Sequence, residues 1–244
     1  MSIADKLTRA KQDIDDVYEA GQKSENKKTW DAIQDYGNRT VYTYGFAYNA
    51  WDDETFNPRY DIKPIGSMNG LFRDIKVVDL EGTLQRCGVI LDTSQATSMN
   101  VAFASIYLQT LPTIDMTSVT GVVSNANLAV QGRVHTIRKI ICVESTPWSG
   151  SSFSAASGLI NLEIEGIIGQ SGLDLHWSKK LSKASITSVI NALSTTTSGL
   201  SITLSKTAVD TAFDINVDEA TTYPEGSEYY VLRHSKDNWT INYL

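Results

Sequence analysis

The sequence has few cysteines. Only Cys87 and Cys142 occur among its 244 residues, and neither belongs to a C-x-x-C pair. This scarcity excludes a small disulfide-framed fold and a cysteine-based zinc site. Each cysteine lies beside apolar β-type runs, so we expect two free, buried thiols. A disulfide between them is the alternative.

Long apolar runs are also missing. Residues 1–21 alternate charged and apolar positions and lack the continuous apolar stretch of about 7 residues that a signal peptide needs. No run of about 18 apolar residues occurs anywhere, so the sequence predicts no membrane insertion. Positive charge is scarce as well. With 28 acidic against 21 basic residues, the net charge of -7 argues against a nucleic-acid partner.

The usual catalytic and cofactor motifs do not occur. His135, His176 and His234 lie in separate segments without metal-ligand spacing, and there is no P-loop, G-x-S-x-G or G-x-G-x-x-G motif. The cluster Asp52-Asp53-Glu54 lacks the alternation of a calcium loop and favours an acidic turn or a helix start over a cation site. We therefore expect no enzyme, no metal and no cofactor. A hydrolase assembled from distant residues is the alternative.

A repeated phrase is the strongest positive signal. Ser67-Met68-Asn69-Gly70-Leu71-Phe72 returns as Ser98-Met99-Asn100-Val101-Ala102-Phe103. Ile75 and Leu80 follow the first copy, as Ile106 and Leu111 follow the second. A phrase that recurs before a β-like run is typical of a solenoid, in which each unit buries its apolar side against a neighbour.

Short β-like runs continue to the end of the chain. The candidate strands are 77–81, 89–93, 113–117, 139–143, 161–165, 173–177, 201–204 and 240–243. Asp92 and Asp115 are 23 residues apart, and so are Ile141 and Ile164. This spacing predicts an α/β fold, an irregular leucine-rich repeat solenoid with short parallel strands spanning residues 65–244.

Alternation within these runs separates two faces. In 161–165, Leu162 and Ile164 point to one side, and the two glutamates point to the other. Extended to the other runs, the pattern predicts an acidic concave sheet that would suit a cationic partner or a glycan. Its members are Asp79, Glu81, Asp115, Glu163, Glu165 and Asp174. Ordinary solvated strand positions are the alternative.

Two smaller regions precede the predicted solenoid. Residues 1–21 form an expected helix with Ser2 as N-cap and Gly21 after its end. Its apolar seam, which could join copies of the chain or dock it on an assembly, consists of Ile3, Leu7, Ala10, Ile14 and Val17. Packing of this helix against its own chain is equally compatible. Residues 22–64 are rich in aromatics and predict a cap over the solenoid end, with sugar stacking as the alternative.

The last third keeps the β-α rhythm. Residues 181–193 predict an amphipathic helix with Ser182 as N-cap, and strand 200–204, helix 206–213 and strand 239–244 follow. Upstream, Trp148 lies in the loop 145–151, which has no apolar periodicity. It is a candidate to stack on a sugar or anchor a partner, or it folds back over Phe153.

Both ends of the chain resemble leucine-rich repeat (BspA-like) proteins of tailed phages and prophages of gut Firmicutes. The leading segments that carry the resemblance are Ala4-Asp5-Lys6-Leu7, Val17-Tyr18-Glu19-Ala20-Gly21-Gln22-Lys23, Trp30-Asp31, Tyr36-Gly37-Asn38-Arg39-Thr40, Trp51-Asp52-Asp53-Glu54 and Phe56-Asn57-Pro58-Arg59-Tyr60. The trailing segments are Leu173-Asp174-Leu175-His176-Trp177-Ser178, Leu181-Ser182, Ile190-Asn191-Ala192-Leu193 and Asn238-Trp239-Thr240-Ile241. In the middle, the repeats depart from the regular BspA-like pattern.

The resemblance implies a virion structural protein, a tail or baseplate appendage that binds the host surface. Its implied partners are other virion proteins through the N-terminal region, a host glycan or surface protein, and further copies of the chain. Synthesis in the host cytoplasm and release by lysis would fit the missing signal peptide. The alternatives are a purely structural tail or capsid component and a bacterial surface adhesin.

Overall fold

The computed structural model describes residues 62–64, 66–120 and 130–244. The expected N-terminal helix with its seam, nearly all of the expected aromatic cap and the Asp52-Asp53-Glu54 cluster lie outside these residues. The described elements are β1 (Gly66–Ser67), α3 (Leu80–Cys87), β2 (Ala96–Ser98), β3 (Thr110–Asp115), β4 (Thr136–Cys142), β5 (Asn161–Gly166), β6 (Asp174–Leu175), α4 (Lys183–Ala192), β7 (Leu200–Leu204), α5 (Lys206–Phe213), the 3-10 helix η1 (Ala220–Thr222), α6 (Glu228–His234) and β8 (Trp239–Tyr243).

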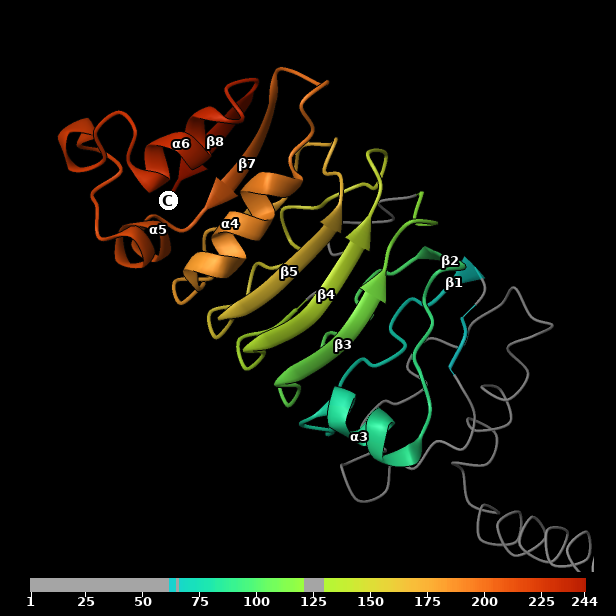
Figure 1. Cartoon of the computed structure of the whole chain (residues 1–244). Coiled ribbons are helices and arrows are strands. Elements are labelled where there is room, and N and C mark those ends of the chain that lie inside the picture. Colours follow the sequence, from blue (N-terminus) through green and yellow to red (C-terminus); the bar gives the residue numbers. More distant parts are fainter. Residues whose placement is uncertain (1–61, 65, 121–129) are drawn as a thin grey trace, which may run out of the picture.

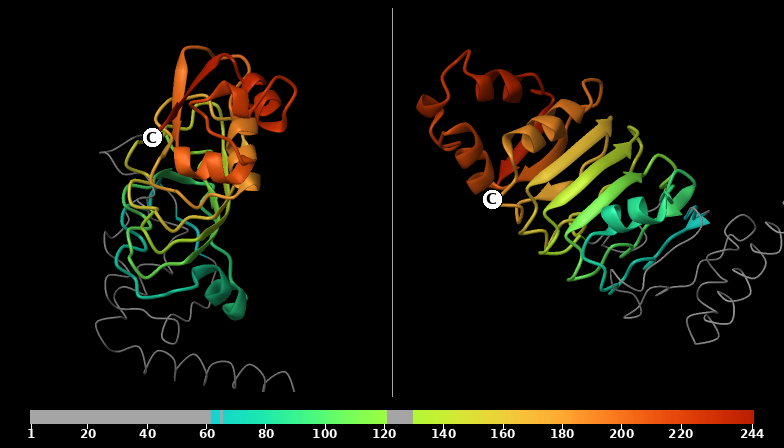
Figure 2. Two further views of the ribbon diagram at one scale, coloured as in Figure 1. Left: turned by 90° about the vertical axis from the view of Figure 1, so that its left-hand side faces the viewer. Right: turned by 60° about the horizontal axis from the view of Figure 1, so that its bottom comes forward.

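The strands form three small sheets, ordered β1-β2, β3-β4-β5 and β6-β7-β8. Every strand pair is parallel, and neighbours in each sheet are consecutive in the chain. The structure thus combines helices with short parallel strands. Figure 1 shows β3, β4 and β5 side by side, with α3 beyond β3 and α4 beyond β5. In the right view of Figure 2 the same two helices flank this sheet.

One row of backbone hydrogen bonds crosses the middle of the molecule. Gln109 N donates to Val78 O at 2.8 Å, and His135 N donates to Gln109 O at 2.9 Å. The row continues through Ile160 N to His135 O at 2.9 Å and Ser182 N to Ile160 O at 2.8 Å. Successive segments of the chain are therefore stacked in sequence order.

The spacing between stacked segments is irregular. Paired residues of β3 and β4 are 26 positions apart, as in Thr110–Thr136. Near the end of β4 and β5 the separation is 24, as in Ile140–Ile164, and in β7 and β8 it is 39, as in Leu200–Trp239. The expected 23-residue spacing is wrong for Ile141 and Ile164, because Ile141 pairs with Glu165. Asp92 and Asp115, the other pair at this spacing, make the same turn, in which each Oδ1 accepts from the amide and hydroxyl of the residue two positions later. A register shift in β4 between Ile137 and Ile140 places one extra residue of β4 against β5, so the spacing falls from 25 residues at Ile137–Leu162 to 24 at Ile140–Ile164.

The repeated phrase forms two stacked turns. Asn69 Oδ1 accepts hydrogen bonds from Ser98 Oγ at 2.6 Å and from Asn100 N at 2.7 Å. The fully buried rings of Phe72 and Phe103 stack with centroids 5.6 Å apart and planes 15° apart. The two copies are therefore direct neighbours in space.

Three expected strands differ in the structure. Residues 77–81 lead into α3, because Asp79 Oδ1 caps the helix by accepting from Gly82 N at 2.9 Å, and Gly88 ends it at φ 68°. Within 89–93 only Leu91 forms a bridge, to Ile62. In 173–177 only Asp174–Leu175 is a strand, and it lies in the β6-β7-β8 sheet.

The last third matches the sequence more closely. Helix α4 begins after Ser182, whose Oγ accepts from Ser185 N, and α5 has the expected bounds. Helix α6, which has 7 residues with only Tyr229 buried, was not predicted from the sequence. So short a helix leaves no apolar periodicity to detect, although its cap Ser227 was a usable signal.

Neither cysteine forms a disulfide. Cys142 is buried, as expected, whereas Cys87 is only partly buried. Burial raises the pKa of the Cys142 thiol to about 11, so this group stays protonated at neutral pH. Within residues 62–64, 66–120 and 130–244, no helix is long and apolar enough to cross a membrane.

Candidate binding groove on the sheet

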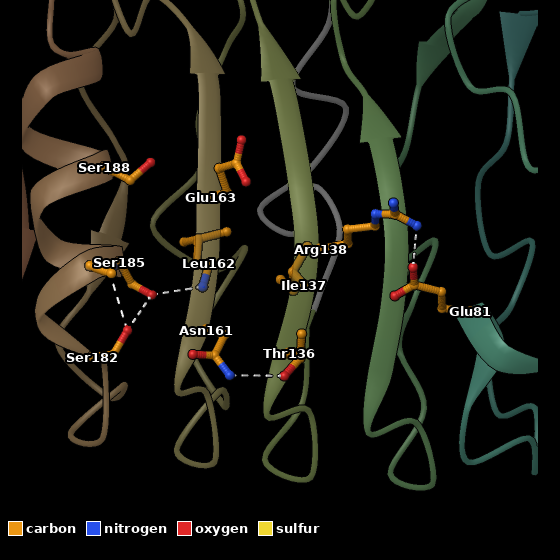
Figure 3. A pocket seen from close by; sticks show the side chains of 11 residues that line it. Glu81, Thr136, Ile137, Arg138, Asn161, Leu162, Glu163, Ser182, Ser185 and Ser188 are labelled. Carbon is orange, nitrogen blue, oxygen red and sulfur yellow. Dashed lines mark hydrogen bonds and ion pairs between the residues drawn. The ribbon is translucent and has the colours of Figure 1, made fainter.

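A groove of about 440 Å³ lies on the open face of the β3-β4-β5 sheet, beside α4 (Figure 3). The buried residues Ile137 and Leu162, 1% and 3% exposed, lie beneath it. Asn161 and Thr136 rise from neighbouring strands at one end, where Asn161 Nδ2 donates to Thr136 Oγ1 at 3.3 Å. The strands thus hold polar groups over a packed apolar base.

Serines of α4 form one wall of the groove. Ser185 Oγ accepts from Leu162 N at 2.8 Å and donates to Ile160 O at 3.1 Å. One turn further, Ser188 Oγ accepts from Ile164 N at 2.9 Å. These hydroxyls take the place of a further strand, so the edge of β5 has hydrogen-bond partners.

Replacing Ser185 with alanine should lower the free energy of unfolding by about 1–3 kcal/mol, because the Leu162 amide would lose its partner in a buried position. Urea denaturation measures this loss. Thr187→Ala on the same helix is the matched control and should change stability by less than about 0.5 kcal/mol. Equal stability of the two variants would contradict the assigned role of Ser185.

Paired charges border the other side of the groove. Arg138 Nη1 lies 2.6 Å from Glu81 Oε1 on α3, so this ion pair spans β3 (Figure 3). Lys139 Nζ contacts Glu165 at 2.7 Å and Glu163 at 3.1 Å. Hydrogen bonding to Glu165, and next to Glu163, raises the pKa of Lys139 above its ordinary value. All of these side chains are partly exposed, so the pairs organise the surface more than they stabilise the fold.

The expected acidic face is therefore a face of mixed charge. Alternation within one strand does not predict the two cations. The candidate strand 139–143 begins after Arg138, and the register shift that exposes Arg138 and Lys139 depends on the neighbouring strand. Glu81 and Glu163 line the groove, and Glu165 lies next to it.

The other predicted carboxylates have local roles. Asp79 caps α3, and Asp115 Oδ1 accepts from the Thr117 amide and hydroxyl at 2.8 and 2.6 Å. Asp174 lies in the other large sheet, where its Oδ1 is 2.6 Å from His176 Nδ1. The structure does not bring these three residues into the groove.

Trp148 is not a surface anchor. Its side chain is buried, with 5% of the residue exposed, so the interpretation as an exposed stacking residue is wrong. Thr146 and Ser149 of the same loop are also buried, and the backbone of Gly172 lies close to the Trp148 carbonyl. Among the described tryptophans the exposed one is Trp177, at 46%, with its ring 4.8 Å from that of His176.

The described residues form no group of three His, Cys, Asp or Glu side chains placed to hold a metal ion. Three oxygen donors, Asp210, Asn216 and Asp218, gather around α5. Their oxygens instead surround Lys206 Nζ, at 2.6, 2.6 and 3.3 Å. The arrangement at this point of the molecule is a network of ion pairs and hydrogen bonds.

Comparisons with family models, with curated proteins and with solved structures gave no match for this chain.

Proposed function

We propose that this chain is a recognition scaffold of a tailed phage, carried on the tail or baseplate, which binds a glycan of the host surface. In this proposal residues 65–244 form an irregular leucine-rich repeat solenoid, and the N-terminal region attaches the chain to other virion proteins. The resemblance of both chain ends to phage leucine-rich repeat proteins supports this assignment. The groove between α3 and α4 is the proposed ligand site, and it is the single observation that carries the binding role.

The chemistry of the groove favours a neutral, hydroxyl-rich ligand. Asn161 places an amide and Glu163 a carboxylate at the groove, and the oxygens of Ser182 and Ser188 line it beside them. Since Arg138 is paired with Glu81 and Lys139 with Glu163 and Glu165, no unpaired block of charge dominates the face. Such a mixture of donors and acceptors suits the hydroxyls of a sugar better than a strongly charged ligand.

A glycan array tests the proposal. The purified full chain should bind at least one bacterial surface polysaccharide, and Asn161→Ala and Arg138→Ala should each weaken that binding about tenfold, because each removes a polar group at the groove. Gln170→Ala, an exposed polar residue outside the groove lining, is the control and should bind as the unmodified chain does. Absence of binding to every polysaccharide, or unchanged binding by both groove variants, would count against the proposal.

A further inference from the structure

The β6-β7-β8 sheet ends in an edge that differs from the edge of β5. The serines of α4 supply hydrogen-bond partners to β5, whereas β8 is the last strand of its sheet. Within the part of the chain that the structure describes, no further strand pairs with the outer side of β8, and the outer backbone groups of Ile241 and Tyr243 have no hydrogen-bond partner. Figure 1 shows β8 at the C-terminal end of the molecule, with α6 packed beside it.

The direction of each backbone group in β8 follows from the contacts to β7. Gly199 N donates to Asn238 O at 3.3 Å. Leu244 N donates to Leu204 O at 3.2 Å, and Leu244 O accepts from Lys206 N at 2.9 Å. The even-numbered residues 238–244 therefore face β7. Because successive residues of a strand point their backbone groups to opposite sides, Ile241 and Tyr243 direct theirs to the outer edge.

We propose that β8 pairs antiparallel with β8 of a second copy of this chain, about a two-fold axis at Ile241. Ile241 would exchange both backbone hydrogen bonds with its counterpart, the pattern of a hydrogen-bonded antiparallel pair. Tyr243 N would donate to the Trp239 carbonyl of the second copy. The Trp239 amide is not required, since it already donates to Lys236 O at 3.0 Å. The contact is isologous and closes after two copies, and it joins the two sheets into one.

The composition of β8 favours a second copy as the occupant. None of its residues, Trp239-Thr240-Ile241-Asn242-Tyr243, carries a charge, so no like charges meet at the two-fold axis. The strand also lacks the lysine, proline and bulge that blunt unused edges. Trp239 and Ile241 are already packed inside, at 2% and 5% exposure, so pairing needs no rearrangement of the core.

The exposed face of the paired strands is complementary to itself. About a two-fold axis at Ile241, Thr240 lies opposite Asn242 of the second copy, and both side chains are exposed. A hydroxyl and an amide can hydrogen-bond across such a pair. Because a strand of 5 residues buries little area, we expect a weak dimer with a dissociation constant on the order of 10–100 µM. This inference does not depend on the proposed glycan site.

Sedimentation equilibrium of the full chain tests the pairing. The mass should rise to that of a dimer with concentration, and the double variants Thr240→Lys/Asn242→Lys and Thr240→Glu/Asn242→Glu should each weaken self-association at least about tenfold. An equimolar mixture of the two variants should restore association, since opposite charges then face each other. Ser201→Lys/Thr203→Lys, on the same sheet face one strand away, is the control and should still associate.

Hydrogen exchange provides a second readout. The amides of Ile241 and Tyr243 should exchange more slowly as the concentration of the unmodified chain rises. A chain that stays monomeric up to about 1 mM, where association would be worth only about 4 kcal/mol, overturns the proposal. An oligomer that persists in both charged variants also overturns it, because such an oligomer would be held by another contact, for example the apolar seam of residues 1–21. Hydrogen exchange at Ile241 and Tyr243 that does not depend on concentration would overturn it as well.

Discussion

Gly166→Ala should be among the most damaging single substitutions in this chain, with an expected loss of at least about 3 kcal/mol in the free energy of unfolding. A Cβ atom at this position would lie 1.9 Å from the Cys142 carbonyl oxygen, and the residue has φ +105°, which disfavours any side chain. The atom that the Cβ would meet belongs to the backbone of the neighbouring strand, because Gly166 is the register partner of Cys142. Relief would require β4 and β5 to separate.

Two other glycines serve as matched controls. Gly150 has open space around it and no positive φ, so Gly150→Ala should be within about 0.5 kcal/mol of the unmodified chain. Gly199 also has open space but φ +74°, so Gly199→Ala should cost about 1 kcal/mol through backbone strain alone. Urea denaturation of the three variants should give the order Gly166, Gly199, Gly150. A loss at Gly166 no larger than that at Gly199 would contradict the close approach of β4 and β5.

Trp148→Ala should lower the free energy of unfolding by about 3–5 kcal/mol, because it empties a site filled by a buried aromatic side chain. The indole Nε1 has no hydrogen-bond partner in the described structure, so the loss comes from packing and not from a broken hydrogen bond. Trp148→Phe should recover part of the stability, since it keeps one ring in the site.

Trp177→Ala is the control for Trp148→Ala. Trp177 is 46% exposed, so its removal should cost less than about 1 kcal/mol. Urea denaturation and near-UV circular dichroism would follow both variants. Similar stabilities for Trp148→Ala and Trp177→Ala would show that Trp148 is not a core residue, and would reopen its interpretation as a ligand contact.

Local sequence patterns predicted a helix or strand correctly where either the two-residue period of a strand or the 3.6-residue period of a helix was clear. Strict alternation in 161–165 located β5, and Ser182 with the apolar spacing that follows it located α4. The run around Asp79 was ambiguous, because Val78 and Leu80 alternate with acidic residues whereas Leu80 and Leu84 lie on one helical face. The caps Asp79 and Gly88 resolve this ambiguity in favour of a helix.

The groove depended on information that no single segment contains. The carboxylates Glu81 and Glu163 were identified from alternation, but their cationic neighbours Arg138 and Lys139 reach the same face only through the register shift of β4 against β5. A register shift is a property of two strands, so a one-dimensional pattern does not reveal it. The burial of Trp148 has a similar origin, since it requires the approach of the segment that contains Gly172.

The hydrogen-bond row through Val78, Gln109, His135 and Ile160 also bears on how such a chain can change length during evolution. The backbone groups of Gln109, His135 and Ile160 in this row bond to the segments directly before and after them. Duplication or deletion of one whole segment would therefore disturb a single pair of neighbouring surfaces and leave the rest in register. The unequal intervals of 24, 26 and 39 residues indicate that each segment also tolerates insertions between its stacked strands. The stack can thus become longer by one whole segment at a time while the segments at its two ends stay unchanged.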